Sequence, residues 1–135
     1  MAAGYSKTPL VRKLGIKEGF KMCVINPPGN YWELLGDLPD GVSIWKLDEG
    51  GLDFIHFFTR HRAQLEESIG ALKAKMVPAG LIWVSWPKKA SGVPTDLDEN
   101  VVRKVALRSG LVDTKVAAVD ETWSGLKLVI RLKDR

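Results

Sequence analysis

The sequence lacks the features that are typical of a secreted or membrane protein. Its 135 residues contain a single cysteine, Cys23, so no disulfide can form within the chain. No segment has the unbroken apolar length of a membrane span, and the N-terminus has no apolar signal region. From these absences we expect a cytoplasmic protein without a membrane partner.

The short motifs of several enzyme classes are also missing. The chain has no phosphate-binding loop, no Gly-x-Gly-x-x-Gly fingerprint and no Gly-x-Ser-x-Gly nucleophile elbow. His56 and His61 form no metal-ligand pattern with Cys23, which lies in an apolar run typical of an inert buried thiol. We therefore assign no catalytic residues and no metal site, and the residues favour a binding protein over an enzyme.

Neither positive nor negative residues are in large excess. Twenty basic and 16 acidic residues give a net charge of +4, in a chain that is 45% hydrophobic and 27% charged. This composition and length are typical of one soluble domain, residues 1–135, with residues 1–7 as a loose N-terminal arm. The mild excess permits an anionic ligand, whereas basic residues spread along the chain argue against nucleic acid as a partner.

Predicted strands and helices alternate along the chain. Apolar runs predict strands at 21–26, 42–47, 52–59, 81–86, 111–119 and 125–132, and periodicity predicts helices at 10–14, 31–36 and 60–76 and a fourth after Asp96. Asn30 with Glu33 and Asp96 with Glu99 have the spacing of capping boxes, and residues 78–80 should end the third helix.

This order predicts an α/β fold. We expect a three-layer, Rossmann-like domain with a mostly parallel sheet of about six strands and helices on both faces. The last connection is too short for a crossover, so the sheet should end in a C-terminal antiparallel hairpin.

The ligand crevice of such a sheet lies beyond the carboxyl ends of its strands. The loops at 27–30, 87–96 and 120–124 are expected to meet there. Their polar, aromatic and glycine residues form the candidate ligand site: Asn30, Trp86, Lys88, Lys89, Ser91, Gly92, Asp120, Glu121, Trp123 and Ser124.

The loop at 87–96, which we call the basic loop, has two interpretations. Lys88 and Lys89 would neutralise an anionic group to which the amides of Ser91 and Gly92 donate, or they would simply be solvated surface lysines. Surface exposure is the more common state of a lysine pair, so the anion site is the minority interpretation.

The acidic and aromatic candidates also have alternative roles. Asp120 and Glu121 would act as acid and base, or they would close the loops through a salt bridge, which we favour. Trp86 fits core packing better than stacking on a ligand ring, whereas Trp123 lies in a turn and is harder to place in a core.

Parts of the chain resemble class I S-adenosylmethionine-dependent methyltransferases. Residues 14–26 resemble the approach to the first strand of that fold, residues 52–86 a strand, helix and Pro-Gly-type turn, and residues 111–131 its terminal hairpin. The resemblance implies S-adenosylmethionine as a cofactor. It places the glycine-rich cofactor loop at 27–30, which keeps one glycine, and the ribose-binding carboxylate at Asp48 or Glu49.

A second resemblance covers nearly the whole chain. Residues 4–10, 86–96 and 120–127 together resemble a family of small bacterial proteins described only as a domain of unknown function. This resemblance implies a bacterial cytoplasmic protein and carries no activity.

Three functional hypotheses follow. The first is a methyltransferase-like domain without an evident catalytic site, which binds a small anionic molecule or a protein partner at the carboxyl-end crevice. The alternative is a diminished S-adenosylmethionine-dependent methyltransferase. The third, nucleic-acid binding through a basic face of the last strand with Lys127, Arg131 and Lys133, ranks last because the net charge is modest. The oligomeric state stays open.

Overall fold

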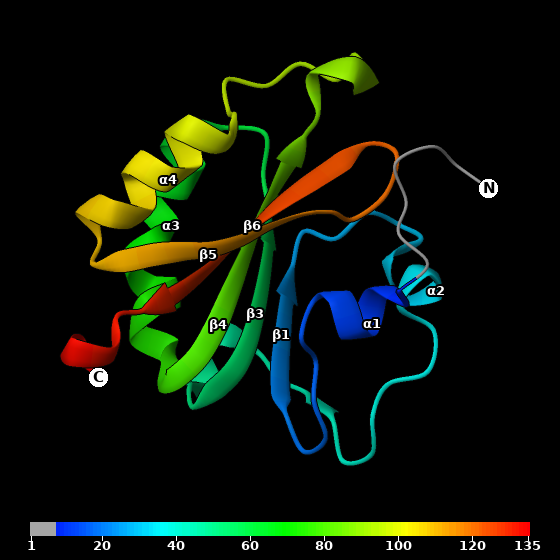
Figure 1. Cartoon of the computed structure of the whole chain (residues 1–135), viewed down its shortest axis with the longest axis vertical. Helices are drawn as coiled ribbons and strands as arrows, with labels where there is room; N and C mark the ends of the chain where they lie inside the picture. Colours follow the sequence, from blue (N-terminus) through cyan, green and yellow to red (C-terminus); the bar gives the residue numbers. More distant parts are fainter. Residues whose placement is uncertain (1–7) are drawn as a thin grey trace.

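A computed structural model describes residues 8–135, so the predicted arm at 1–7 lies outside the described residues. Its centre is a six-stranded sheet in the order β2-β1-β3-β4-β6-β5 (Figure 1). The strands are β1 (Lys21–Ile25), β2 (Ser43–Ile44), β3 (Leu52–Phe58), β4 (Met76–Pro87), β5 (Leu111–Ala118) and β6 (Trp123–Ile130).

The pairing of the strands matches the prediction. β2, β1, β3 and β4 are parallel, whereas β6 is antiparallel to both β4 and β5. The final strand therefore lies between β4 and β5 and not at the edge of the sheet. The predicted mostly parallel sheet with a terminal antiparallel hairpin is confirmed.

Helices cover both faces of this sheet. They are α1 (Leu10–Lys13), α2 (Tyr31–Leu35), α3 (Arg62–Lys75) and α4 (Glu99–Arg108), with short 3-10 turns η1 (Leu47–Glu49), η2 (Lys89–Ser91) and η3 (Leu132–Asp134). Figure 1 shows α3 and α4 on one side of the sheet and α1 and α2 on the other. No helix among residues 8–135 is long and apolar enough to cross a membrane.

Alternating side chains of the central strands build two cores. In β3, Ile55 and Phe57 join the core beneath α3 and α4, whereas Phe54 and Phe58 join the core beneath α1 and α2. Both faces of β3 are buried, which explains why its sequence is mostly apolar and does not alternate regularly with polar residues.

The predicted capping boxes are wrong in both helices. Asp98 is the N-cap of α4, where its carboxylate accepts from the amide of Val101 at 2.8 Å. Asp96 instead accepts from the amide of Arg62 at 2.8 Å and caps α3 across the fold. Asn30 precedes α2 but makes no capping bond through its side chain. Spacing alone did not distinguish two aspartates two residues apart.

Residues 78–80 do not end a helix. α3 ends at Lys75 and β4 begins at Met76, so Pro78, Ala79 and Gly80 lie inside the strand. A Cβ on Gly80 would lie 3.0 Å from the carbonyl oxygen of Leu52 and 3.1 Å from that of Asp53, next to an irregularity in the β3–β4 pairing. The glycine allows close backbone approach at this irregularity.

β2 is much shorter than predicted, and β6 is shifted by two residues from the predicted 125–132 to Trp123–Ile130. β2 keeps only Ser43–Ile44 at the edge of the sheet, and the chain continues into η1 at Leu47. β6 ends at Ile130, so Arg131 and Lys133 lie beyond the sheet, and the side chain of Arg131 pairs with Asp134 at 3.1 Å. The predicted basic face of the last strand therefore keeps only Lys127.

Candidate functional site

Two of the predicted loops meet at the carboxyl edge of the parallel strands. The amide of Lys88 donates to the carbonyl of Thr122 at 2.8 Å, and Lys88 Nζ donates to the carbonyl of Asp120 at 2.8 Å. These bonds continue the β4–β6 pairing beyond the partners Pro87 and Trp123. The ammonium group of Lys88 is thereby held close to the β5–β6 turn.

Asp120 shapes this turn through its carboxylate. One carboxylate oxygen accepts from the amides of Thr122 at 2.8 Å and Trp123 at 2.7 Å. Neither Asp120 nor the exposed Glu121 forms an ion pair with any residue between 8 and 135. The predicted salt bridge is wrong, since the carboxylate is used to hold the turn that presents Trp123.

The middle of the basic loop forms a turn of its own. Ser91 Oγ donates to the carbonyl of Lys88 at 2.6 Å and accepts from the amide of Val93 at 3.2 Å. Gly92 ends η2 with a φ of 76°, a conformation that favours glycine, and Lys89 is exposed. The hydroxyl of Ser91 is therefore occupied by the loop itself.

Other predicted site residues lie apart from the crevice. Trp86 is only 6% exposed and belongs to the core beneath α3 and α4, as the core-packing interpretation predicted. Ser124 is its partner in the β4–β6 ladder and is half-buried, while Asn30 is exposed next to α2.

The far end of the basic loop holds the turn that follows β3. Thr95 Oγ1 donates to the carbonyl of Arg60 at 2.7 Å, and the amide of Asp96 approaches the same oxygen at 3.4 Å. With the Asp96 cap on α3, these contacts hold the backbone on both sides of His61, at Arg60 and at Arg62. The basic loop thus positions a neighbouring turn that the sequence did not single out.

A pocket of about 240 Å³ opens beside that turn, at the carboxyl edge of the sheet. The ring of Trp123 packs edge-on against Phe58, with 5.2 Å between ring centroids, and forms its apolar side. Arg60 is exposed and has no ion-pair partner in residues 8–135. The residues that line the pocket are Asn26, Phe58, Thr59, Arg60, His61, Gln64 and Trp123.

Asn26 begins the turn out of β1. Its φ of 57° lies in the left-handed region, which asparagine tolerates better than most residues, and its side-chain amide makes a long 3.5 Å contact to the carbonyl of Phe58. The chain leaves the strand here and continues into Pro27 and Pro28. This turn connects the first predicted loop to the pocket, although Asn30 itself does not line it.

Sequence reasoning missed Thr59, Arg60 and His61. Thr59 Oγ1 accepts from the amide of His61 at 3.1 Å and is hydrogen-bonded to the side chain of Gln64, which rigidifies the turn. The prediction began the helix at Arg60 and left no loop after the third strand, whereas α3 begins at Arg62. Applying the carboxyl-edge rule to every parallel strand would have found these residues.

A buried polar network lies next to the pocket but faces the protein interior. His56 Nδ1 is 2.9 Å from Tyr31 Oη, and His56 Nε2 is 2.8 Å from Ser85 Oγ. All three residues are 0% exposed, so no substrate reaches the hydroxyl of Ser85. Burial lowers the pKa of His56 to about 3 and raises the pKa of Tyr31. The histidine is therefore neutral and links β3, β4 and α2.

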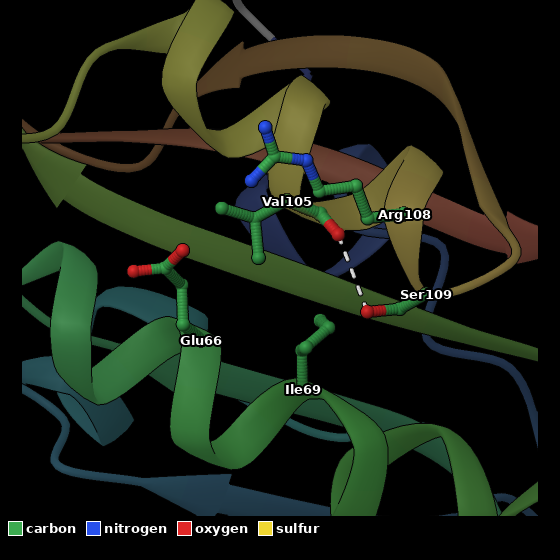
Figure 2. A pocket seen from close by; sticks show the side chains of 5 residues that line it. All are labelled: Glu66, Ile69, Val105, Arg108 and Ser109. Atoms are coloured by element: carbon green, nitrogen blue, oxygen red, sulfur yellow. Dashed lines mark hydrogen bonds between the residues drawn. The ribbon is translucent and has the colours of Figure 1, made fainter.

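A second pocket, of about 140 Å³, lies between α3 and α4 (Figure 2). Glu66 and Ile69 enter it from α3, whereas Val105, Arg108 and Ser109 enter from the α4 side. Ser109 Oγ donates to the carbonyl of Val105 at 3.2 Å, so its hydroxyl is occupied by the end of the helix. This pocket is a weaker candidate than the pocket at the sheet edge, because it is small and the hydroxyl of Ser109 is already bonded.

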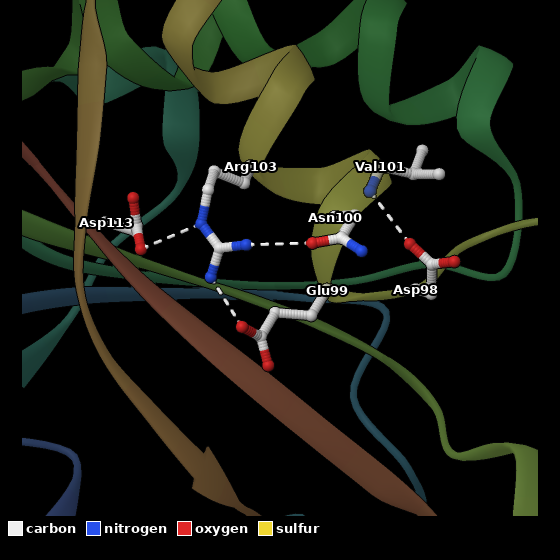
Figure 3. A network of polar contacts seen from close by, with 6 residues as sticks. All are labelled: Asp98, Glu99, Asn100, Val101, Arg103 and Asp113. Atoms are coloured by element: carbon white, nitrogen blue, oxygen red, sulfur yellow. Dashed lines mark hydrogen bonds and ion pairs between the residues drawn. The ribbon is translucent and has the colours of Figure 1, made fainter.

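Arg103 of α4 has two carboxylate partners. Figure 3 shows Arg103 between Asp113 of β5 and the side chains of Glu99 and Asn100. This network attaches α4 to the edge strand. No group of three His, Cys, Asp or Glu side chains within 8–135 could hold a metal ion. Cys23 is buried, and burial raises the pKa of its thiol.

The described residues do not fit S-adenosylmethionine at the positions that the resemblance implies. Lys75 Nζ donates to the carbonyl of Asp48 at 3.2 Å, and Lys75 ends α3, the helix whose first turn lines the pocket. The carboxylate of Glu49 accepts from the amide of Lys46. Both carboxylates thus lie near the opposite end of α3, and Pro27 and Pro28 offer no amides to a cofactor.

Comparison with solved structures agrees with this architecture. A SAM-dependent methyltransferase from Aquifex aeolicus matches with a TM-score of 0.65 and 16% identity, over 90% of this chain and 88% of that one. The magnesium protoporphyrin IX methyltransferase of Synechocystis PCC 6803, with bound SAH, matches with a TM-score of 0.56 and 14% identity, over 90% and 78%. Aeropyrum pernix fibrillarin, in complex with S-adenosyl-L-methionine, matches with a TM-score of 0.56 and 13% identity, over 93% and 70%.

No protein-family model and no curated protein matches the chain, so its membership of the small bacterial family stays a prediction. At these low identities, the similarity to solved structures concerns the fold alone. The described chain has a methyltransferase-like, Rossmann-like fold.

Proposed function

We propose that this chain binds a small anionic molecule with a planar or apolar part in the pocket at the carboxyl edge of its methyltransferase-like sheet. The observation that carries the proposal is the pocket itself, which sets the unpaired cation of Arg60 beside the half-buried ring of Trp123. The bacterial cytoplasmic setting implied by the second resemblance belongs to the same proposal.

The chemistry of the pocket suits an anion. The guanidinium of Arg60 offers a fork of donors to a carboxylate or phosphate, and Asn26 and Gln64 each add a side-chain amide to the lining. The carboxylate of Asp96 lies nearby, but it already accepts from the amide of Arg62. The ring of Trp123 offers its surface to the planar part of a ligand.

The size of the pocket favours a small ligand. Its volume of about 240 Å³ lies below the range of about 300–1,000 Å³ that is usual for drug-sized ligands. A partner protein would not enter such a pocket, and a whole S-adenosylmethionine molecule would exceed it. These points favour the small-anion hypothesis over a diminished methyltransferase.

Calorimetric titration with matched probes tests the proposal. Phenyl phosphate and benzoate carry the expected charge and ring, phenol is their uncharged counterpart, and S-adenosylmethionine tests the alternative. We expect the two anions to bind and phenol to bind more weakly. Arg60→Ala should weaken phenyl phosphate by about 10-fold or more, since a hydrogen bond to a charged group contributes about 1.5–3 kcal/mol.

Arg108→Ala is the matched control, because Arg108 is an exposed arginine at the other pocket. Its affinity should equal that of the unmodified protein. Equal effects of the two substitutions, or no binding of either anion, would refute the proposal. Tight binding of S-adenosylmethionine would favour the methyltransferase instead.

A further inference from the structure

A row of lysines crosses the face of the sheet beside α1. Lys115 of β5 and Lys127 of β6 are direct cross-strand partners. Lys115 Nζ donates to the carbonyl of Lys13 at 3.1 Å, and Lys13 Nζ donates to the carbonyl of Ala118 at 2.9 Å. With Lys88 and Lys17, these residues form what we call the lysine row: Lys88, Lys13, Lys115, Lys127 and Lys17.

The members of the row lie close enough for their charges to interact. Burial lowers the pKa of Lys13, and the charges of Lys115 and Lys88 lower it further. Burial likewise lowers the pKa of Lys127, with further contributions from Lys115 and Lys17. Each lysine therefore has another member of the row as an electrostatic neighbour.

No carboxylate compensates these charges within residues 8–135, where none of the five lysines forms an ion pair. The first seven residues contain no acidic side chain either. Like charges directly opposite each other destabilise a sheet, so the pair Lys115 and Lys127 carries a cost. By contrast, Arg103 on α4 has two carboxylate partners (Figure 3).

The row is too long for a single small anion. Lys88 follows β4 at the carboxyl edge, and Lys127 lies four residues along β6 from Trp123 at that edge. At about 3.3 Å per residue, this separation is roughly 13 Å along the strand. Nucleic-acid phosphates follow one another at about 3.4 Å of helix axis per strand, so one strand can supply several phosphates over this length.

We propose that the lysine row binds the phosphate backbone of a nucleic acid. Phosphate contacts are commonly made by lysine and arginine, whereas the cores of protein–protein interfaces are depleted in lysine. The net charge of +4 does not indicate this basic surface, because acidic residues elsewhere in the sequence offset the lysines that the fold brings together on one face. The proposal uses none of the pocket residues and is independent of the proposed function.

Fluorescence anisotropy with a labelled single-stranded oligouridylate tests it. If all five lysines contact phosphates, the logarithm of the affinity should fall with the logarithm of salt concentration with a slope of about −3.5. Raising salt from 50 to 200 mM should then weaken binding about 130-fold. Lys115→Gln with Lys127→Gln should reduce the slope by about 1.4 and weaken binding about 25-fold at 0.1 M salt.

Lys104→Gln with Arg108→Gln is the matched control, because it removes two exposed positive charges from α4 and leaves the same net charge. This variant should change the affinity by less than about 2-fold, since neither residue belongs to the row. Thermal unfolding verifies that the Lys115 and Lys127 variant folds, and we expect no loss of stability because a repulsive pair is removed.

Three results would each overturn the inference. They are no binding at 50 mM salt, equal weakening by the two double variants, and competition by polyglutamate as effective as competition by unlabelled oligouridylate. The last result would indicate an acidic protein partner.

Discussion

His56 should make the stability of this protein sensitive to mild acid. The imidazole is completely buried and bonded to Tyr31 and Ser85, and burial lowers its pKa to about 3. In the unfolded chain a histidine titrates near its ordinary pKa of about 6.5. Between these two values the unfolded state binds one proton more than the folded state, so stability falls as the pH falls.

The magnitude follows from the two pKa values. The contribution of His56 is fully present above pH 6.5 and is lost as the pH falls toward 3, at about 1.4 kcal/mol per pH unit in the middle of this range. Relative to pH 7, the loss is about 2 kcal/mol at pH 5 and about 3 kcal/mol at pH 4. Since small domains have only about 5–15 kcal/mol of stability, such a loss is readily measured.

Urea unfolding followed by circular dichroism between pH 4.5 and pH 8 measures this loss. The unmodified protein should show the one-proton dependence, and His56→Gln should lose it even if that variant is less stable overall. His61→Gln, which removes the only other histidine, is the matched control and should retain it. A stability that does not change from pH 7 to pH 5, or an unchanged slope in His56→Gln, would refute the reasoning.

Two further predictions concern packing and capping. In a denaturant titration, Gly125→Ala should lower the free energy of unfolding by about 1–3 kcal/mol, because a Cβ would lie 3.0 Å from the ring of Trp83. The control Gly29→Ala should have little effect, because a Cβ there meets nothing within 4 Å. Asp98→Ala should cost about 1 kcal/mol through loss of the α4 cap. Retained stability in Asp98→Ala, with a loss in Asp96→Ala alone, would contradict the assigned caps.

The sheet could be predicted because its causes lie within short segments. The run Phe54–Phe58 is apolar except for His56 and does not alternate with polar residues, which distinguishes a covered parallel strand from an exposed one. The connection from Ala118 to Trp123 is too short for a helix, so the antiparallel order of β5 and β6 followed from length alone. Both features depend on neighbours in sequence.

The site could be predicted only in part, because it depends on contacts between segments that are far apart in sequence. Sequence placed Trp123 correctly at the carboxyl edge, but it did not show that Asp96 caps α3 instead of α4. With this cap α3 begins at Arg62, and Arg60 and His61 form a turn after β3. A capping bond between residues 34 positions apart has no signature in local spacing.

The lysine row shows the same limit on a larger scale. Lys13 and Lys115 are 102 positions apart in sequence, yet Lys115 Nζ donates to the Lys13 carbonyl. The composition gives only the net charge of the whole chain, which is mild. The fold shows where the positive charges lie close together. The basic face predicted for the last strand failed because Arg131 and Lys133 lie beyond β6.

The most direct test of the pocket is the tryptophan side-chain region of a ¹H–¹⁵N NMR spectrum during titration with phenyl phosphate. Each of the five tryptophans gives one indole N–H signal. We predict that the signal of Trp123 shifts while that of Trp83, which is buried and donates to the carbonyl of Leu14 at 2.8 Å, stays in place. An unmoved Trp123 signal at saturating probe would contradict the account.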